Sequence, residues 1–87
     1  NSNLPVIKIK KSEFEIGVNI LDVVVRSKLL NSKSEARRSI KDRGVKINDI
    51  PVEQDSYSIS LSDFKNNSTL CKLSHGKKKH VIIKLVN

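Results

Sequence analysis

The residues of this 87-residue chain best suited to chemistry are cations, which gather in two short segments. The first segment runs from Lys33 to Lys46, and the second is Lys77–Lys79. Clustered Lys and Arg side chains repel one another, and a polyanion relieves this repulsion while releasing its own counterions. Arg can also hold one phosphate through two parallel hydrogen bonds. The residue types therefore predict binding of a phosphate backbone, although charge alone is equally consistent with a solvated helix face.

The predicted binding residues are the cations of both segments and one hydroxyl beside them. They are Lys33, Ser34, Arg37, Arg38, Lys41, Arg43, Lys46, Lys77, Lys78 and Lys79. Two alternatives remain open. Arg43 and Lys46 could pair with Asp42 or Asp49, and the lysines of residues 77–79 could instead block sheet-to-sheet pairing at a strand edge.

The distribution of charge along the chain supports a basic face over a uniformly basic coat. The formal net charge is +8 and the sequence pI is about 9.9, which indicates a polyanionic partner. Eight of the basic residues and only two acids lie in residues 26–46. Residues 47–63 carry four acids and no base, and residues 65–87 carry six lysines and no acid. We expect the acidic segment to keep the non-binding face away from phosphate.

Several other classes of function are disfavoured by what the sequence lacks. Cys71 is the only cysteine, so neither an intrachain disulfide nor a cysteine-rich metal site can form. A zinc site of Cys71, His75 and His80 would have too few ligands, so no metal site is predicted. No phosphate-binding glycine loop and no nucleophile–base pair is visible, so no catalytic residue and no cofactor is predicted for this domain.

The absence of membrane-spanning and signal segments and the low aromatic content further narrow the expected location and partner. No apolar stretch is long enough to cross a bilayer and no signal peptide is visible, so we expect a cytoplasmic protein that does not contact membrane. Aromatic residues make up only 3% of the chain, whereas single-stranded nucleic acid is usually bound on stacked aromatic side chains. The expected partner is therefore structured, double-stranded RNA that is recognised by its backbone and shape. We expect Phe14, Tyr57 and Phe64 to lie in or near the core.

Two capped helices are expected to position the first basic segment. Asn19 is a suitable N-cap for a helix to about residue 30, in which Asp22 and Arg26 form an i,i+4 pair. Ser32 and Glu35 form an S-x-x-E capping box that begins a second helix. Such a short connection predicts a helical hairpin. Gly44 is expected to end the second helix with positive φ.

A helical wheel divides the second helix into two sides. Lys33, Arg37, Arg38 and Lys41 share one arc and are expected to face solvent. Ala36 and Ile40 lie beside that arc and are expected to pack on the preceding helix.

Strands are expected on both sides of the helical hairpin. Alternation predicts strands at residues 6–10 and 45–47, a turn at Asn48-Asp49 and an edge strand at residues 50–52. Residues 53–68 are polar, with Ile59, Leu61 and Phe64 as anchors, and a final hairpin joins residues 69–74 to 80–86. Residues 1–5 are expected to be the remnant of a linker, and residues 6–87 a single domain. The predicted class is α+β, with an αα-hairpin on a small, mainly antiparallel sheet.

These elements resemble a known RNA-binding family. The segment Ser32-Lys33-Ser34-Glu35-Ala36-Arg37-Arg38 and the following Gly44-Val45-Lys46-Ile47-Asn48 resemble the alpha-L RNA-binding motif. With the preceding helix and the late Gly76-Lys77-Lys78 before an apolar strand, the chain is similar to the C-terminal domain of bacterial-type tyrosyl-tRNA synthetases. It departs from that pattern where Ser39 replaces Leu, Asp49 replaces Gly and Ser74-His75 stand where Arg is common.

The resemblance implies a function that the residues alone do not. It implies that the domain holds tRNA, expected to be tRNA(Tyr), between the anticodon stem and the long variable arm. It also implies a parent tyrosine-tRNA ligase whose separate catalytic domain would use ATP and Mg and form a homodimer. Two alternatives remain open: an alpha-L module of a ribosome-associated or RNA-modifying protein, and a basic domain that binds acidic protein.

Overall fold

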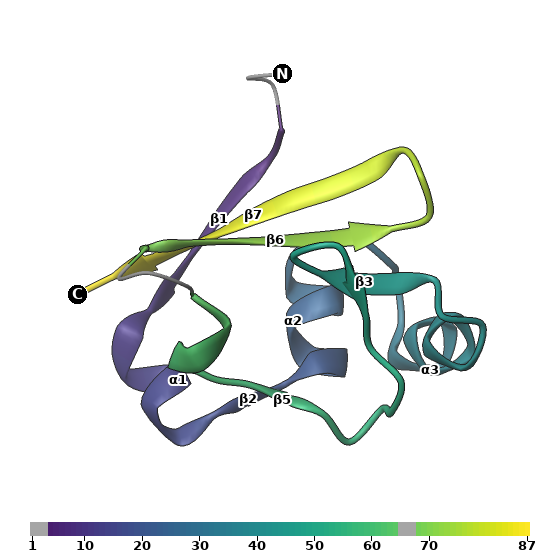
Figure 1. The fold of residues 1–87 in the computed structure, drawn as a ribbon, viewed down its shortest axis with the longest axis horizontal. Helices are drawn as coiled ribbons and strands as arrows, with labels where there is room; N and C mark the ends of the chain where they lie inside the picture. Colours follow the sequence, from purple (N-terminus) through teal and green to yellow (C-terminus); the bar gives the residue numbers. More distant parts are fainter. Residues whose placement is uncertain (1–3, 65–67) are drawn as a thin grey trace.

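The computed structural model describes residues 4–64 and 68–87, which form an α+β fold (Figure 1). In chain order the elements are β1 (Val6–Lys10), α1 (Lys11–Ile16), β2 (Val18–Asn19), α2 (Ile20–Arg26), α3 (Lys33–Lys41), β3 (Val45–Ile47), β4 (Ile50–Pro51), β5 (Ser58–Ile59), the 3-10 helix η1 (Leu61–Asp63), β6 (Leu70–His75) and β7 (Lys79–Val86). The helices lie on one side of the β6–β7 hairpin in Figure 1. The α+β class expected from the sequence is thus confirmed.

The main sheet has five strands in the order β1-β7-β6-β3-β4. β1 pairs with β7 in parallel, and the other three pairings are antiparallel. A second sheet consists only of β2 and β5. Pro51 lies on β4 at one edge, as expected for a residue that cannot donate a ladder hydrogen bond. β7 is therefore an internal strand that pairs with β1 along one edge and with β6 along the other, although it is the last strand in sequence.

The core lies between one face of this sheet and the helices. Strand residues alternate in direction, so Ile9, Leu73, Val81 and Ile83 all point inward and are at most 3% exposed. Phe14 and Phe64 join the core with ring centroids 5.1 Å apart, whereas Tyr57 is 38% exposed. Two of the three aromatic residues are therefore core residues, and Tyr57 is at the surface.

The helix starts follow from their caps. The side chain of Asn19 accepts a hydrogen bond from the backbone N–H of Leu21 at the start of α2. Ser32 likewise accepts from the N–H of Glu35 at the start of α3. The Glu35 carboxylate accepts from the N–H of Asn31, one residue earlier than a reciprocal capping box requires.

The end of α3 differs from the prediction. Arg43, with φ 58°, adopts the left-handed conformation that was expected of Gly44. The N–H of Arg43 donates to the carbonyl of Ile40, and that of Gly44 donates to Ser39, which together form a Schellman motif. Glycine at position 44 avoids a tight contact, because a Cβ there would lie 3.3 Å from the Ser39 carbonyl oxygen.

Other differences concern contacts that local sequence does not encode. α1 was not predicted, and α2 ends at Arg26, earlier than expected. Asp22 and Arg26 do not pair with each other, because Asp22 contacts Lys33 and Arg26 contacts Glu13. Of the expected linker at residues 1–5, residues 1–3 lie outside the described residues, while the Pro5 carbonyl accepts from the N–H of Ile82. Residues 65–67 of the polar segment also lie outside them.

Candidate nucleic-acid interface

α3 presents its cations to solvent as the sequence predicts. Ala36 and Ile40 are buried at 0% and 2% exposure, so they fix the inward side of the helix against α2. The four cations of the helix, Lys33, Arg37, Arg38 and Lys41, and Ser34 are all exposed. Arg38 and Lys41 have no ion-pair partner in the described part of the chain.

The second basic segment is attached to the end of α3. The N–H of Gly76 donates to the Gly44 carbonyl at 3.0 Å, and Ser39 Oγ lies 3.0 Å from His75 Nε2. These contacts join the base of the β6–β7 turn to the C-terminal end of the helix, although more than thirty residues separate them in sequence. Lys77 in the turn is consequently held close to the end of the helix, and all of Lys77–Lys79 is exposed. Ser39 and His75, two departures from the alpha-L pattern, therefore contact each other.

His80 shapes the turn that carries these lysines. Its Nε2 lies 3.1 Å from the Lys77 carbonyl oxygen, which can only accept, so Nε2 carries a hydrogen. In the neutral ring Nδ1 then accepts a hydrogen bond from Ser74 Oγ at 2.8 Å. Both histidines thus have structural partners, and no cluster of three metal-binding side chains occurs among residues 4–64 and 68–87.

Three of the predicted cations contact carboxylates. Lys33 Nζ lies 2.8 Å from Asp22, Arg37 Nε lies 3.6 Å from Asp55, and Arg43 Nη2 lies 3.9 Å from Glu53. The partner of Arg43 is thus neither Asp42 nor Asp49. Because all these side chains are largely exposed, each pair contributes only about 0–1 kcal/mol to stability.

The acidic segment consequently lies beside the predicted binding face. The expectation that the acidic segment keeps the non-binding face away from phosphate was wrong for Glu53 and Asp55, because these two carboxylates approach Arg43 and Arg37. A phosphate group that binds there must replace these carboxylates or share the cations with them. The pairing of these carboxylates with the basic segment was not predicted from the sequence. The change in net charge from +6 in residues 26–46 to −4 in residues 47–63 was a signal that the two segments could attract each other.

Lys46 is separated from the other predicted residues. It lies on β3 between the buried Val45 and Ile47, so its half-buried side chain points to the opposite face of the sheet. The structure therefore groups α3 with the β6–β7 turn and places Lys46 on a different surface.

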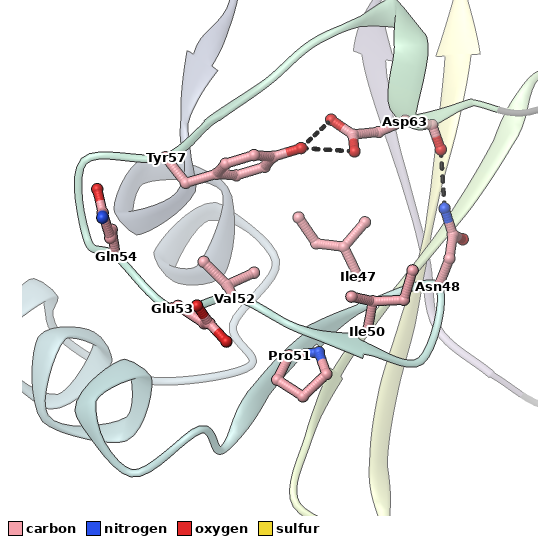
Figure 2. A pocket seen from close by; sticks show the side chains of 9 residues that line it. All are labelled: Ile47, Asn48, Ile50, Pro51, Val52, Glu53, Gln54, Tyr57 and Asp63. Carbon is pink, nitrogen blue, oxygen red and sulfur yellow. Dashed lines mark hydrogen bonds between the residues drawn. The ribbon is translucent and has the colours of Figure 1, made fainter.

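A hollow on another part of the surface has the wrong charge for phosphate. Figure 2 shows its apolar lining from Ile47, Ile50 and Val52, with Tyr57 pointing toward Asp63. The Tyr57 hydroxyl donates to the Asp63 carboxylate at 2.7 Å, and burial together with this bond raises the pKa of Tyr57 to about 12. The hollow carries carboxylates and no cation, so it provides no site for a nucleic acid.

The single thiol is also unsuited to chemistry at neutral pH. Cys71 is 1% exposed on the inward face of β6, as its alternation with Leu73 predicted. Burial raises the pKa of this thiol to about 12, so the thiolate that would act as a nucleophile is scarce.

Among the described residues no helix is long and apolar enough to cross a membrane.

Comparison with known proteins identifies the family. Residues 1–83 match the family described as tyrosine–tRNA ligase SYY-like C-terminal domain. The tyrosine–tRNA ligase of Pelagibacter ubique is 45% identical over 84 residues, which are 97% of this chain and 20% of that protein. The tyrosine–tRNA ligase of Ehrlichia chaffeensis is 42% identical over 98% of this chain and 20% of its own length, and that of Bradyrhizobium diazoefficiens is 39% identical over 94% and 19%.

The chain thus spans about a fifth of the length of these relatives. The match covers β1 through most of β7, so it includes both basic segments and the helical hairpin. The match favours the tyrosyl-tRNA synthetase domain over the alternative of an alpha-L module from a ribosome-associated or RNA-modifying protein. The chain belongs to the SYY-like C-terminal domain family of tyrosine–tRNA ligases.

Proposed function

We propose that this domain binds tRNA, specifically tRNA(Tyr), through the phosphate backbone. In this proposal it is the appended module of a cytoplasmic tyrosine–tRNA ligase, and aminoacylation with ATP and Mg takes place in a separate, dimeric catalytic part. The domain itself contributes no catalytic residue. Its role is to hold the RNA near the anticodon stem and the long variable arm.

The observation that carries the proposal is the attachment of one basic segment to the other. The Gly76–Gly44 and Ser39–His75 contacts bring the β6–β7 turn, which carries Lys77 and Lys78 and leads into Lys79 of β7, to the end of the exposed cationic helix. The base of the turn and the C-terminal end of the helix therefore lie side by side, and Arg38 and Lys41 have no carboxylate partner in the described chain. Neutralisation of these cations by phosphates releases counterions and gives affinity without sequence-specific base contacts.

The ion pairs of α3, and that of Arg43 just beyond its end, support reversible binding. Since Asp22, Asp55 and Glu53 form exposed pairs of small stability, phosphates can replace them at low cost. The same pairs show that the helix can accept carboxylates, which favours an acidic protein as the second candidate partner. Competition separates the two candidates, because a protein that uses the same helix would be displaced by tRNA.

The test is a titration of the 87-residue domain with tRNA(Tyr) and with a tRNA that lacks a long variable arm, over a series of salt concentrations. We expect tighter binding of tRNA(Tyr) and a dissociation constant that rises steeply with salt. Equal, weak binding of both RNAs would contradict recognition of tRNA(Tyr). No binding of either would contradict the RNA-binding function and favour the acidic protein.

A further inference from the structure

The face of the main sheet that points away from the helices carries five lysines, and we call it the open sheet face. The strand register places them together: Lys8 on β1, Lys84 on β7, Lys72 on β6, Lys46 on β3, and Lys10 at the end of β1. Their neighbours in each strand, such as Ile9, Ile83 and Val45, point into the core. Lys46 was predicted as a binding residue from the sequence, but none of the five lysines lies on the surface of α3 and the β6–β7 turn proposed above.

Lys8 and Lys84 are direct partners across the parallel β1–β7 pairing. Adjacent strands lie about 5 Å apart, so two ammonium groups on the same face repel each other and lower the stability of the sheet. Both side chains are exposed. The repulsion is not relieved within the described chain, because only Lys72 of the five has a carboxylate within ion-pair distance, Asp49 at 2.9 Å. Residues 1–3 and 65–67 contain no Asp or Glu either.

Apolar side chains on this face do not form a separate patch. Val6 and Leu70 are 52% and 48% exposed, but the register places each in a row with a lysine. Val6 lies beside Ile82, whose other neighbour is Lys72, and Leu70 lies beside Lys84. A sheet face on which exposed lysines lie on neighbouring strands and no separate apolar patch forms is complementary to a polyanion.

We propose that the open sheet face is a second phosphate-binding surface, distinct from α3 and the β6–β7 turn, and that its ligand is the RNA backbone. This inference rests on the proposed function, because it assigns a second contact with the same RNA. The helices lie on the other side of the β6–β7 hairpin (Figure 1), so the two surfaces face in different directions. An RNA that contacts both must bend or branch around the domain.

The test compares three variants of the 87-residue domain, each titrated with tRNA(Tyr) over a salt series. Lys8→Gln with Lys84→Gln removes two charges from the open sheet face while it keeps most of each side chain. Lys8→Arg with Lys84→Arg retains the charge. Lys11→Gln with Ser12→Glu changes the net charge by the same two units at two exposed positions at the start of α1.

We expect the Gln pair to raise the dissociation constant roughly fivefold and to reduce the salt slope by about two, while its Tm stays equal or rises. The Arg pair should bind like the original domain, and the α1 variant should change the dissociation constant by less than about twofold. Unchanged affinity in the Gln pair, or an equal loss in the α1 variant, would overturn the second surface.

A second comparison keeps the two proposals distinguishable. Arg37→Ala with Arg38→Ala should weaken binding independently, so that the fold-changes of the two double variants multiply when they are combined. If the helix variant weakens binding and the sheet variant does not, the proposed function stands and this inference fails. If the original domain binds no RNA, both fail.

Discussion

The two basic surfaces of this domain differ in how their charges are balanced. On α3, Lys33 and Arg37 each contact a carboxylate from another part of the chain. On the open sheet face, Lys8 and Lys84 contact no carboxylate in the described structure and lie next to each other. The helix therefore carries internal counter-ions that a phosphate must displace, whereas the sheet carries repulsion that a phosphate would relieve. Equal numbers of cations can thus contribute unequally to binding.

The largest expected effect comes from a change that breaks both surfaces at once. Ile83 is fully buried on the inward face of β7, between β1 and β6. Ile83→Ala should lower the free energy of unfolding by about 2–5 kcal/mol, because it removes buried methyl groups and leaves a cavity. Urea denaturation measures this change. The matched control is Ile82→Ala on the open sheet face, and an equal loss in both variants would contradict the assignment of the faces.

The next effect is specific to the helix. Arg37→Ala with Arg38→Ala should raise the dissociation constant for tRNA(Tyr) on the order of 30-fold, since two charge-assisted contacts together contribute about 2 kcal/mol. The fold should persist, because both side chains are exposed. Titration and thermal unfolding of the same samples provide the measurements. Arg26→Ala, an exposed arginine of α2 that pairs with Glu13, is the control, and a similar loss in it would point to a general charge effect.

A smaller effect of opposite sign tests the internal counter-ions directly. Asp55→Asn should tighten RNA binding by about threefold, because it removes one negative charge and leaves Arg37 without its carboxylate partner. The bond from the Asn19 side chain to the backbone carbonyl of residue 55 is kept. Glu15→Gln, an exposed carboxylate of α1, provides the same change of net charge elsewhere. If it tightens binding equally, displacement of the Asp55 carboxylate is not what limits affinity.

Asp49→Asn applies the same test to the open sheet face. The Lys72 side chain, through its hydrogen bond and its charge, lowers the pKa of the Asp49 carboxyl, so this pair is present at neutral pH. Asn tolerates the left-handed backbone at this position, where φ is 71°. We expect a gain of about twofold in RNA affinity by titration. A loss of affinity would indicate that the pair organises the surface and does not compete with phosphate.

The smallest expected effect lies in the core and is absent at neutral pH. The pKa of Cys71 rises from 9.0 to about 12 on burial, so the unfolded chain loses the thiol proton first as the pH rises. Its contribution to stability is complete below pH 9 and is lost progressively between pH 9 and about 12. Between pH 9 and 11 the urea midpoint of the unmodified domain should therefore fall, and that of the Cys71→Val variant should fall less. Identical pH profiles would contradict this, and RNA binding at pH 7 should be unchanged in either case.

Features encoded by adjacent residues could be predicted from the sequence. The Ser32 cap, the inward Ala36 and Ile40, and the strands at residues 6–10 and 45–47 each depend on spacing within a few positions. The edge position of Pro51 follows from its missing N–H. The exposure of the α3 cations was predictable for the same reason, because the helical period alone determines which side they share.

Features that depend on distant residues could not be predicted. Asp22 contacts Lys33 instead of Arg26, because the packing of α2 against α3 brings it closer to another helix than to its own next turn. The approach of Asp55 to Arg37 likewise depends on the path of a segment without regular structure. The open sheet face required the register of four strands, since alternation shows which residues share a face only after the strands are paired.

The parallel pairing of β1 with β7 has a consequence for how the domain folds. Val6 pairs with Ile82 and Lys10 with Val86, so the first and last strands of the domain lie side by side. Closing so long a loop has a high entropic cost, and proteins rich in such non-local contacts fold slowly. Because β7 also joins β1 to β6, the sheet cannot be completed until its last strand has been synthesised. During translation the basic helical hairpin will therefore emerge well before the sheet that supports it is complete, and folding of the whole domain must wait for β7.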